Sequence, residues 1–292
     1  MQLSYEGWYN RERGGAVMKK GPGFVRSRWF QILVGGIVLF VATEQALRIT
    51  GTPNLIPTVL LLGAFVVPLT FVAYFYGQER TIDRERHQGQ APLTTGALCF
   101  LIGGVLGVAA AATIEYTTLR TTSVLGLFGV GFIEEVAKLI FPVALFIRGR
   151  YSSEADGLFF GVACGMGFAA LETMGYGLTA LIASRGSVGG LEEVLFIRGL
   201  LAPAGPAAWT GFICAVLWRE RNRTTPKAFN FAVVGAFILA VVLHSLWDII
   251  NSFGGPTAAQ FIIVIVGNVA IAAVSLTLLF RRLRESRRFP VS

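Results

Sequence analysis

The sequence predicts an all-α fold, a polytopic membrane helix bundle with about eight transmembrane helices. Of its 292 residues, 54% are hydrophobic and only 14% are charged, whereas a soluble domain carries about 25% charged residues. Long apolar runs recur along the chain, and a membrane-spanning helix needs about 20 such residues. The runs lack the two-residue alternation of a membrane barrel, so they are predicted to be helices.

Eight apolar segments are long enough to cross a bilayer. They predict a transmembrane domain over residues 29–280, preceded by a cytoplasmic tail (1–28) and followed by a basic cytoplasmic tail (281–292). The predicted helices cover residues 29–49, 53–77, 95–115, 122–147, 156–184, 191–217, 228–253 and 258–280.

Lysine and arginine residues predict the orientation of these helices. They cluster before the first helix and after the second, fourth, sixth and eighth, whereas the opposite loops hold only Arg120 and Arg185. Basic loops stay in the cytoplasm, so both termini are predicted to be cytoplasmic in a multi-pass protein of the plasma membrane. The net charge of +8 fits this bias and contact with anionic lipid. No loop is long enough to form a basic nucleic-acid-binding domain.

The first, second, third and eighth helices are expected to be packing elements. Glu44 and Arg48 lie four residues apart near the outer end of the first helix and are expected to pair. Glu115 lies at the outer end of the third helix, where a carboxylate needs no function. The three cysteines are expected to be small buried apolar residues.

The fourth helix carries Glu134, Glu135 and Lys138 near its middle. A charge at the bilayer centre costs at least about 2.5–3.5 kcal/mol. The lysine lies three and four residues from the glutamates, so it shares a helix face with them. A purely structural ion pair with Lys138 would explain the presence of one of the two glutamates. It would leave the other glutamate without a partner on its own helix.

The fifth and seventh helices also carry ionisable residues at depth. Glu172 stands alone in the glycine-rich fifth helix, and His244 and Asp248 lie four apart in the seventh. His87, the other histidine, falls in a charged loop and is expected to be solvated. At 1.5 Å per residue, Glu135, Glu172 and His244 lie within roughly 6 Å of one level. They are therefore expected to face one another or a water-filled cavity.

Glutamate and histidine side chains together suit Zn²⁺ or a similar divalent ion. A further glutamate beside an activated water can act as a general base. The predicted layer is therefore suited to hydrolysis within the membrane.

The motifs EEVAK, DGLFFGVACGMGFAALE, FIRGLLAPAG and HSLWD follow one another on successive predicted helices. In this order they resemble the PrsW family of intramembrane proteases, over about residues 130–252. That family is distantly similar to the CAAX-processing and bacteriocin-immunity membrane proteases. The resemblance implies a membrane-embedded metallopeptidase, with Zn²⁺ as the expected ion, that cleaves membrane-anchored protein substrates. In the best-known branch the substrate is an anti-sigma factor, and its cleavage frees a stress-response sigma factor.

The resemblance also implies site residues. Its catalytic positions correspond to Glu134, Glu135, Lys138 and Arg198, and Glu135 is slightly favoured as the general base. Glu172 and His244 match the glutamate of its second motif and its last histidine, and together with Asp248, one turn beyond His244, they are the expected metal ligands.

One position departs from the family pattern, because Pro206 stands where the third motif is expected to have a histidine. Proline cannot ligate a metal and removes a backbone donor. Arg198 and Pro206 lie eight residues apart, so they are expected on one interior side of the sixth helix, which the proline is expected to kink.

Two other functions stay open. Pro206 favours a catalytically weakened or inactive pseudoprotease that serves as a scaffold. Buried glutamates, a lysine and a histidine also occur in proton-coupled transporters, although many carriers show matching halves with interrupted helices, and none is evident here. Chelator-sensitive cleavage would indicate the peptidase, and flux driven by an ion gradient would indicate the transporter.

Overall fold

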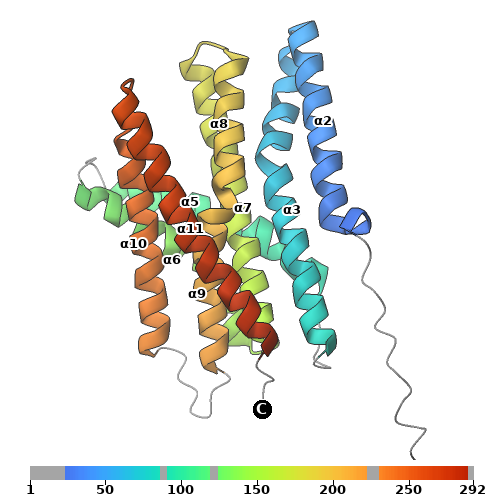
Figure 1. Ribbon diagram of the computed structural model, residues 1–292, viewed down its shortest axis with the longest axis vertical. Coiled ribbons are helices and arrows are strands. Elements are labelled where there is room, and N and C mark those ends of the chain that lie inside the picture. The colour runs from blue at the N-terminus through green and yellow to red at the C-terminus, as the bar shows by residue number, and fades with distance from the viewer. Residues whose placement is uncertain (1–23, 86–90, 119–123, 222–229, 289–292) are drawn as a thin grey trace, which may run out of the picture.

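The computed structural model describes residues 24–85, 91–118, 124–221 and 230–288, and within these ranges the chain is helical without strands. Figure 1 shows the helices arranged as a bundle. The helices are α2 (Arg28–Thr50), α3 (Ile56–Glu85), α4 (Leu93–Leu98), α5 (Gly104–Thr118), α6 (Val124–Arg148), α7 (Glu154–Ala183), α8 (Val188–Leu201), α9 (Pro206–Arg221), α10 (Phe231–Ser252) and α11 (Ala258–Arg288). A π-helical turn, η3 (Cys99–Gly103), joins α4 to α5, and a 3₁₀ turn, η4 (Ala202–Ala204), follows α8.

Within the described residues, helices occupy all eight predicted segments, which confirms the all-α bundle. In the part of the chain that the structure describes, seven spans are long and apolar enough to cross a membrane: Arg28–Thr50, Pro53–Ile82, Leu93–Thr117, Glu154–Ala183, Val188–Arg221, Phe231–Ser252 and Ala258–Arg287. The remaining predicted span is α6, which carries the three charged residues near its middle. The chain is therefore a multi-pass membrane protein, and α6 contributes three charged residues from the middle of an otherwise apolar helix.

Helix α7 forms the centre of the bundle, and its glycines allow α9 to approach closely. A Cβ atom at Gly161 would lie 2.5 Å from the carbonyl oxygen of Thr210, and one at Gly165 would lie 2.3 Å from that of Pro206. Residues four apart share a helix face, so these glycines form a flat strip against α9. Small residues commonly allow such close approach between membrane helices.

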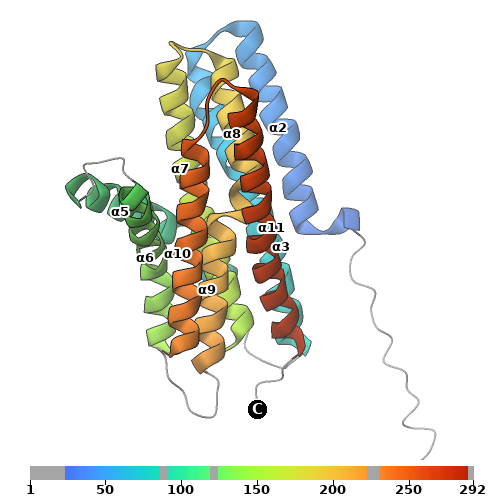
Figure 2. The ribbon, with the colours of Figure 1, turned by 60° about the vertical axis from the view of Figure 1, so that its left-hand side comes forward.

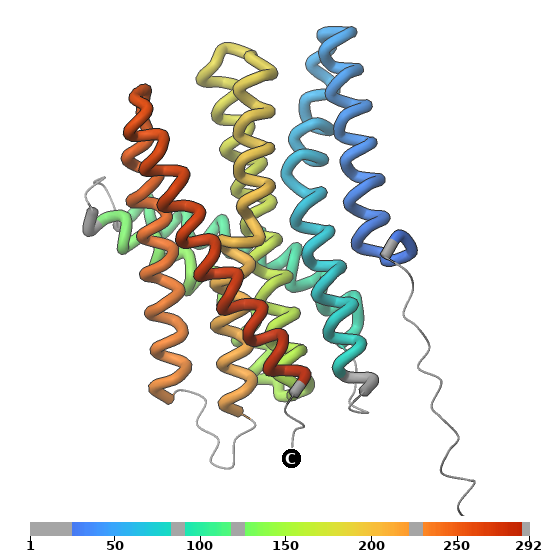
Figure 3. Tube along the Cα trace, in the orientation of Figure 1, coloured from blue at the N-terminus to red at the C-terminus, as the bar shows by residue number. Residues whose placement is uncertain are grey.

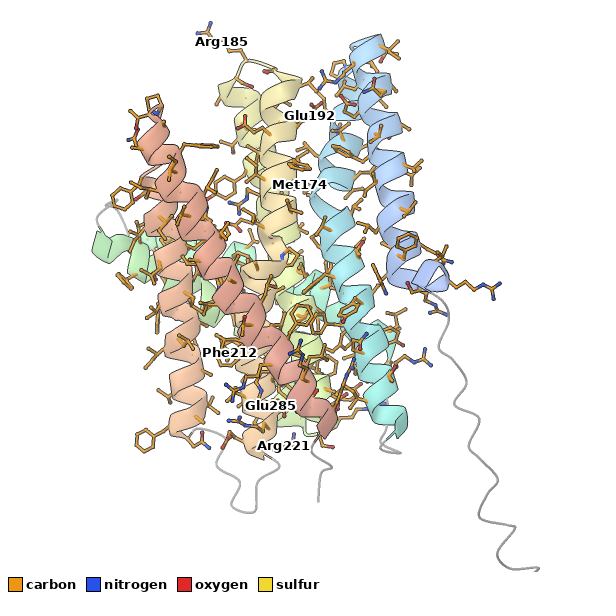
Figure 4. The ribbon with its side chains drawn as sticks, in the orientation of Figure 1. Met174, Arg185, Glu192, Phe212, Arg221 and Glu285 are labelled. Atoms are coloured by element: carbon orange, nitrogen blue, oxygen red, sulfur yellow. The ribbon has the colours of Figure 1, made fainter. Side chains whose placement is uncertain are left out.

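The ends of the helices lie at different depths. In Figures 1 and 2 the connections α2–α3, α7–α8 and α10–α11 lie at one end of the bundle. The ends of α5 and α6 that adjoin residues 119–123 lie only about midway along it, as the trace in Figure 3 also shows. Figure 4 places Arg185 and Glu192 toward the first end and Arg221 and Glu285 toward the opposite one.

The predicted sixth helix is interrupted. Helix α8 ends at Leu201, η4 follows, and Pro206 is the first residue of α9. Proline fits the first position of a helix, because its missing N–H would have no helical partner there. The expected kink is therefore confirmed, in the form of a break between two helices.

The predicted tails differ in part from the structure. Helix α11 continues beyond Phe280 to Arg288, because Arg281 pairs with Glu285 at 2.7 Å and Arg282 pairs with Glu154 of α7 at 3.0 Å. The start of the basic tail is thus helical and packed against the bundle. Residues 1–23 and 289–292, and His87 in the charged loop, lie outside the described residues.

Candidate active site

Three charged side chains of α6 form a buried cluster. Nζ of Lys138 lies 3.0 Å from Oε2 of Glu134 and 2.9 Å from Oε1 of Glu135. The lysine is fully buried, and its ammonium group lies 4.2 Å from the centre of the Phe168 ring on α7. One lysine therefore offsets part of the charge of both glutamates, as their spacing predicts, and the aromatic face adds a cation–π contact.

His244 of α10 connects to both glutamates. Its Nδ1 lies 2.9 Å from Oε1 of Glu135, and its Nε2 lies 3.5 Å from Oε2 of Glu134. Nε2 also lies 3.5 Å from Oδ2 of Asp248, one turn along the same helix. Because an ionised carboxylate only accepts hydrogen bonds, Nδ1 donates to Glu135. Nε2 faces the carboxylates of Glu134 and Asp248, where it donates to them when it carries a proton and can bind a cation with them when it does not.

The two adjacent glutamates have different surroundings. Glu135 is 0% exposed; its Oε1 accepts from Lys138 and His244, and its Oε2 accepts from Oγ1 of Thr210 at 3.4 Å. Glu134 is 8% exposed and lines a cavity that Glu135 does not reach. Glu134 is therefore the carboxylate of this pair that a substrate or water can approach.

The cavity holds about 520 Å³ and lies between α5, α6, α7, α8, α9 and α10. Its lining contains four carboxylates, one imidazole and one guanidinium. These charged or ionisable residues are Glu115, Glu134, Glu172, Arg198, His244 and Asp248, and Pro206 and Trp209 also line it. All the predicted site residues except Glu135 and Lys138 thus line one cavity, and those two lie directly behind Glu134.

Glu172 and Arg198 form an ion pair between α7 and α8. Oε2 of Glu172 lies 2.7 Å from a terminal nitrogen of Arg198, whose guanidinium lies 4.0 Å from the centre of the Tyr176 ring. The sequence predicts both residues as site residues without predicting their contact, because they are on different helices. Glu172 lines the same cavity as His244, and its predicted role as a metal ligand stays a prediction.

The sequence analysis did not assign a site role to Glu115 or Trp209. Glu115 was expected at the membrane surface without a function, but it lines the cavity because α5 ends midway along the bundle. Trp209 stacks on His244 with ring centroids 4.7 Å apart and an interplanar angle of 22°. The only sequence signal for it is a large aromatic residue in a run of small ones, three residues after Pro206.

The donor atoms around His244 can be compared with the needs of a divalent ion. Among the described residues, no three His, Cys, Asp or Glu side chains are already gathered as a metal site. Nitrogen and oxygen ligands bind Zn²⁺ at about 2.0–2.2 Å, which in a tetrahedron separates them by about 3.4 Å. Nε2 of His244 lies 3.5 Å from Asp248 and from Glu134. Each of these pairs therefore fits a shared cation, while Pro206 offers no ligand.

Comparison with protein-family models gives one match, to the model described as PrsW family intramembrane metalloprotease, over residues 91–276. The matched range extends from the start of α4 into α11 and includes every site residue described above. None of the curated proteins and none of the solved structures is similar enough to the chain to count as a match.

Proposed function

The chain belongs to the PrsW family of intramembrane metalloproteases, and we propose that it hydrolyses membrane-anchored proteins in the cavity beside His244, with Glu134 as the general base. The observation that supports this role is the difference between the two glutamates. Glu134 lines the cavity next to Nε2 of His244, whereas Glu135 is fully buried with hydrogen bonds to both its oxygens. A general base must reach the proton that it removes. We therefore favour Glu134, where sequence reasoning slightly favoured Glu135.

In the proposed reaction, water attacks the carbonyl carbon of the scissile peptide bond and Glu134 takes a proton from that water. The carbon–nitrogen bond then breaks, and the proton passes from Glu134 to the leaving amine nitrogen. Lys138 stabilises the charged form of Glu134 from behind the cavity. Glu135 acts on the reaction only by holding His244 through Nδ1, as carboxylates commonly hold the histidines of metal sites.

A divalent ion, with Zn²⁺ as the expected one, supplies Lewis-acid polarisation and water activation when it is bound. His244 and Asp248 would hold it, with Glu172 as the predicted further ligand. Their nitrogen and oxygen donors suit Zn²⁺. This assignment leaves Glu134 free to accept the proton.

Arg198 is proposed to stabilise charge on the substrate. It lines the cavity, and its Nε atom is buried without a hydrogen-bond partner among the described residues. A donor held in this way is suited to a carbonyl oxygen that gains negative charge during attack. Its ion pair with Glu172 and its contact with Tyr176 fix its position.

The substrate class follows from the setting of the cavity. Apart from α6, the helices around the cavity belong to spans that are long and apolar enough to cross a bilayer, so the substrate is proposed to be a membrane-anchored protein. An anti-sigma factor in a stress response is the specific candidate that the family resemblance suggests. We further propose a plasma-membrane location with both termini cytoplasmic, and contact between anionic lipid and the basic end that includes Arg221 and Arg284.

Purified protein in lipid vesicles, mixed with a membrane-anchored reporter, tests this function. Cleavage should stop when a chelator removes divalent ions and resume when Zn²⁺ is added back. Cleavage that continues undiminished after the metal has been removed, as verified by elemental analysis, would contradict the metallopeptidase.

Pro206 supports a second candidate, a weakened or inactive enzyme that binds membrane proteins without cutting them. It lines the cavity at the first position of α9 and supplies no ligand. In that case the protein would bind the reporter in the same vesicles but would release no product with any added divalent ion.

A further inference from the structure

Helix α11 was expected to be a packing element, but its buried face carries three polar residues at a regular spacing. Asn268, Ser275 and Arg282 lie seven residues apart and are all buried. Seven residues make almost two helical turns, so the three side chains lie along one face of the helix.

Each of these residues bonds to a different helix around the candidate active site. The amides of Asn268 and Asn251 on α10 exchange hydrogen bonds of 3.0 and 3.3 Å. Oγ of Ser275 accepts a 2.9 Å hydrogen bond from the indole nitrogen of Trp209 on α9. Arg282 pairs with Glu154 of α7. Helix α11 is thus fixed to the three helices by specific polar contacts.

The contact at Ser275 leads directly to His244. Trp209 is only 2% exposed, and its ring stacks on the imidazole at 4.7 Å. The indole has a single hydrogen-bond donor, and this N–H donates to Ser275. The hydrogen bond therefore restrains the position of the Trp209 ring in addition to packing.

His244 needs a restraint of this kind. Its hydrogen bond to Glu135 fixes the direction of Nδ1, but the longer 3.5 Å contacts of Nε2 leave the ring some freedom to tilt about that direction. A flat surface against one face removes this freedom. Nε2 then stays aimed at Glu134 and Asp248.

We propose that Trp209 and Ser275 are positioning residues that hold the plane of the His244 imidazole for the reaction. The link to catalysis rests on the proposed function, whereas the restraint on the ring does not. If Trp209 were only a core residue beside Ile213 and Leu243, loss of its hydrogen bond would lower stability without turning the imidazole.

Ser275→Ala removes the acceptor of the Trp209 hydrogen bond and changes the side-chain volume little. A second serine of the chain provides a matched control. Ser286 lies on the same helix and is also buried, but its hydroxyl bonds to the carbonyl oxygen of Leu283 in its own helix. Ser286→Ala is therefore the same change without a link to Trp209. Ser275→Thr keeps the hydroxyl, and Trp209→Phe keeps an aromatic face but removes the donor.

Two measurements are made on the full-length protein in vesicles or detergent: kcat and KM for a membrane-anchored reporter, and nitrogen NMR signals of the His244 ring. Substitution of His87, the other histidine of the chain, leaves one imidazole to observe. Ser275→Ala and Trp209→Phe should lower kcat by about 10-fold or more with little change in KM, as loss of outer contacts does at similar sites. Both should shift the ring signals, whereas Ser275→Thr and Ser286→Ala should resemble the parent protein.

The inference is overturned if Ser275→Ala and Ser286→Ala give the same ring signals, or if kcat falls without a change in those signals. A shifted ring with unchanged kcat overturns the link to hydrolysis. If the parent protein cleaves nothing, the proposed function fails, and the ring signals alone still decide whether Trp209 and Ser275 position His244.

Discussion

Glu135 and His244, which are 109 residues apart in sequence, form a buried hydrogen bond of 2.9 Å between Oε1 and Nδ1. The same oxygen accepts a hydrogen bond from Lys138. This contact joins α6 to α10 and determines which ring nitrogen of His244 faces the cavity. The contact explains why two adjacent glutamates lie deep in one helix. Glu134 faces the cavity, and Glu135 holds the imidazole of His244.

Lys138→Met should destabilise the protein strongly. The change leaves Glu134 and Glu135 buried beside each other without their cation, and removal of one partner from a buried pair typically costs about 3–5 kcal/mol. Thermal unfolding in detergent measures the loss. The double variant Lys138→Met with Glu135→Gln should recover part of it, because one unpaired charge is then gone. Additive effects of the two changes would argue against a shared charge cluster.

Gly165→Ala should be more harmful than Gly175→Ala in the same helix. A Cβ atom at Gly165 would lie 2.3 Å from the carbonyl oxygen of Pro206, whereas one at Gly175 would meet nothing within 4 Å. Overpacking costs about 1–3 kcal/mol, while an alanine in open helix interior gains roughly 0.5–1 kcal/mol over glycine. Thermal unfolding of both variants provides the comparison. Equal stability of the two would show that α7 and α9 do not pack so closely.

Pro206→His should raise the amount of Zn²⁺ retained by the purified protein, as measured by elemental analysis after dialysis. The position lines the cavity that contains His244 and Asp248, and an imidazole is a good ligand for Zn²⁺. Reporter cleavage should rise with the metal content.

Pro206→Ala is the control for this change, because it restores the backbone N–H without adding a ligand. The break between α8 and α9 should persist in both variants, since Gly205 and η4 remain. If the histidine variant holds no more Zn²⁺ than the alanine variant, the site does not need a ligand at this position.

The sequence predicts those parts of the site that lie within one helix. Residues three or four apart share a face whatever surrounds the helix, so the contacts of Lys138 with Glu134 and of His244 with Asp248 could be expected. The pairing of Glu44 with Arg48 is confirmed for the same reason. The break at Pro206 follows from the chemistry of proline.

Contacts between helices could not be predicted in the same way. The rotation and depth of a membrane helix depend on its neighbours, so nothing in the sequence pairs Glu172 with Arg198 or Ser275 with Trp209. Glu115 was placed at the membrane surface because counting residues assumes that every helix ends at one level. Arg48 also bonds to Glu192 of α8, a contact that the spacing within α2 does not reveal.

The most direct test compares Glu134→Gln with Glu135→Gln in the vesicle assay, at a temperature where thermal unfolding shows both variants to be folded. Glu134→Gln should lower the cleavage rate by about 10²-fold or more, as expected for loss of a general base, and should cost less stability than Glu135→Gln, because Glu134 borders the cavity and Lys138 keeps its contact with Glu135. Glu135→Gln should lose about 1.5–3 kcal/mol of stability, because a fully buried charged acceptor is removed, and should still cleave measurably faster than Glu134→Gln. The opposite order of rates, or full activity in Glu134→Gln, would contradict the assignment of Glu134 as the base.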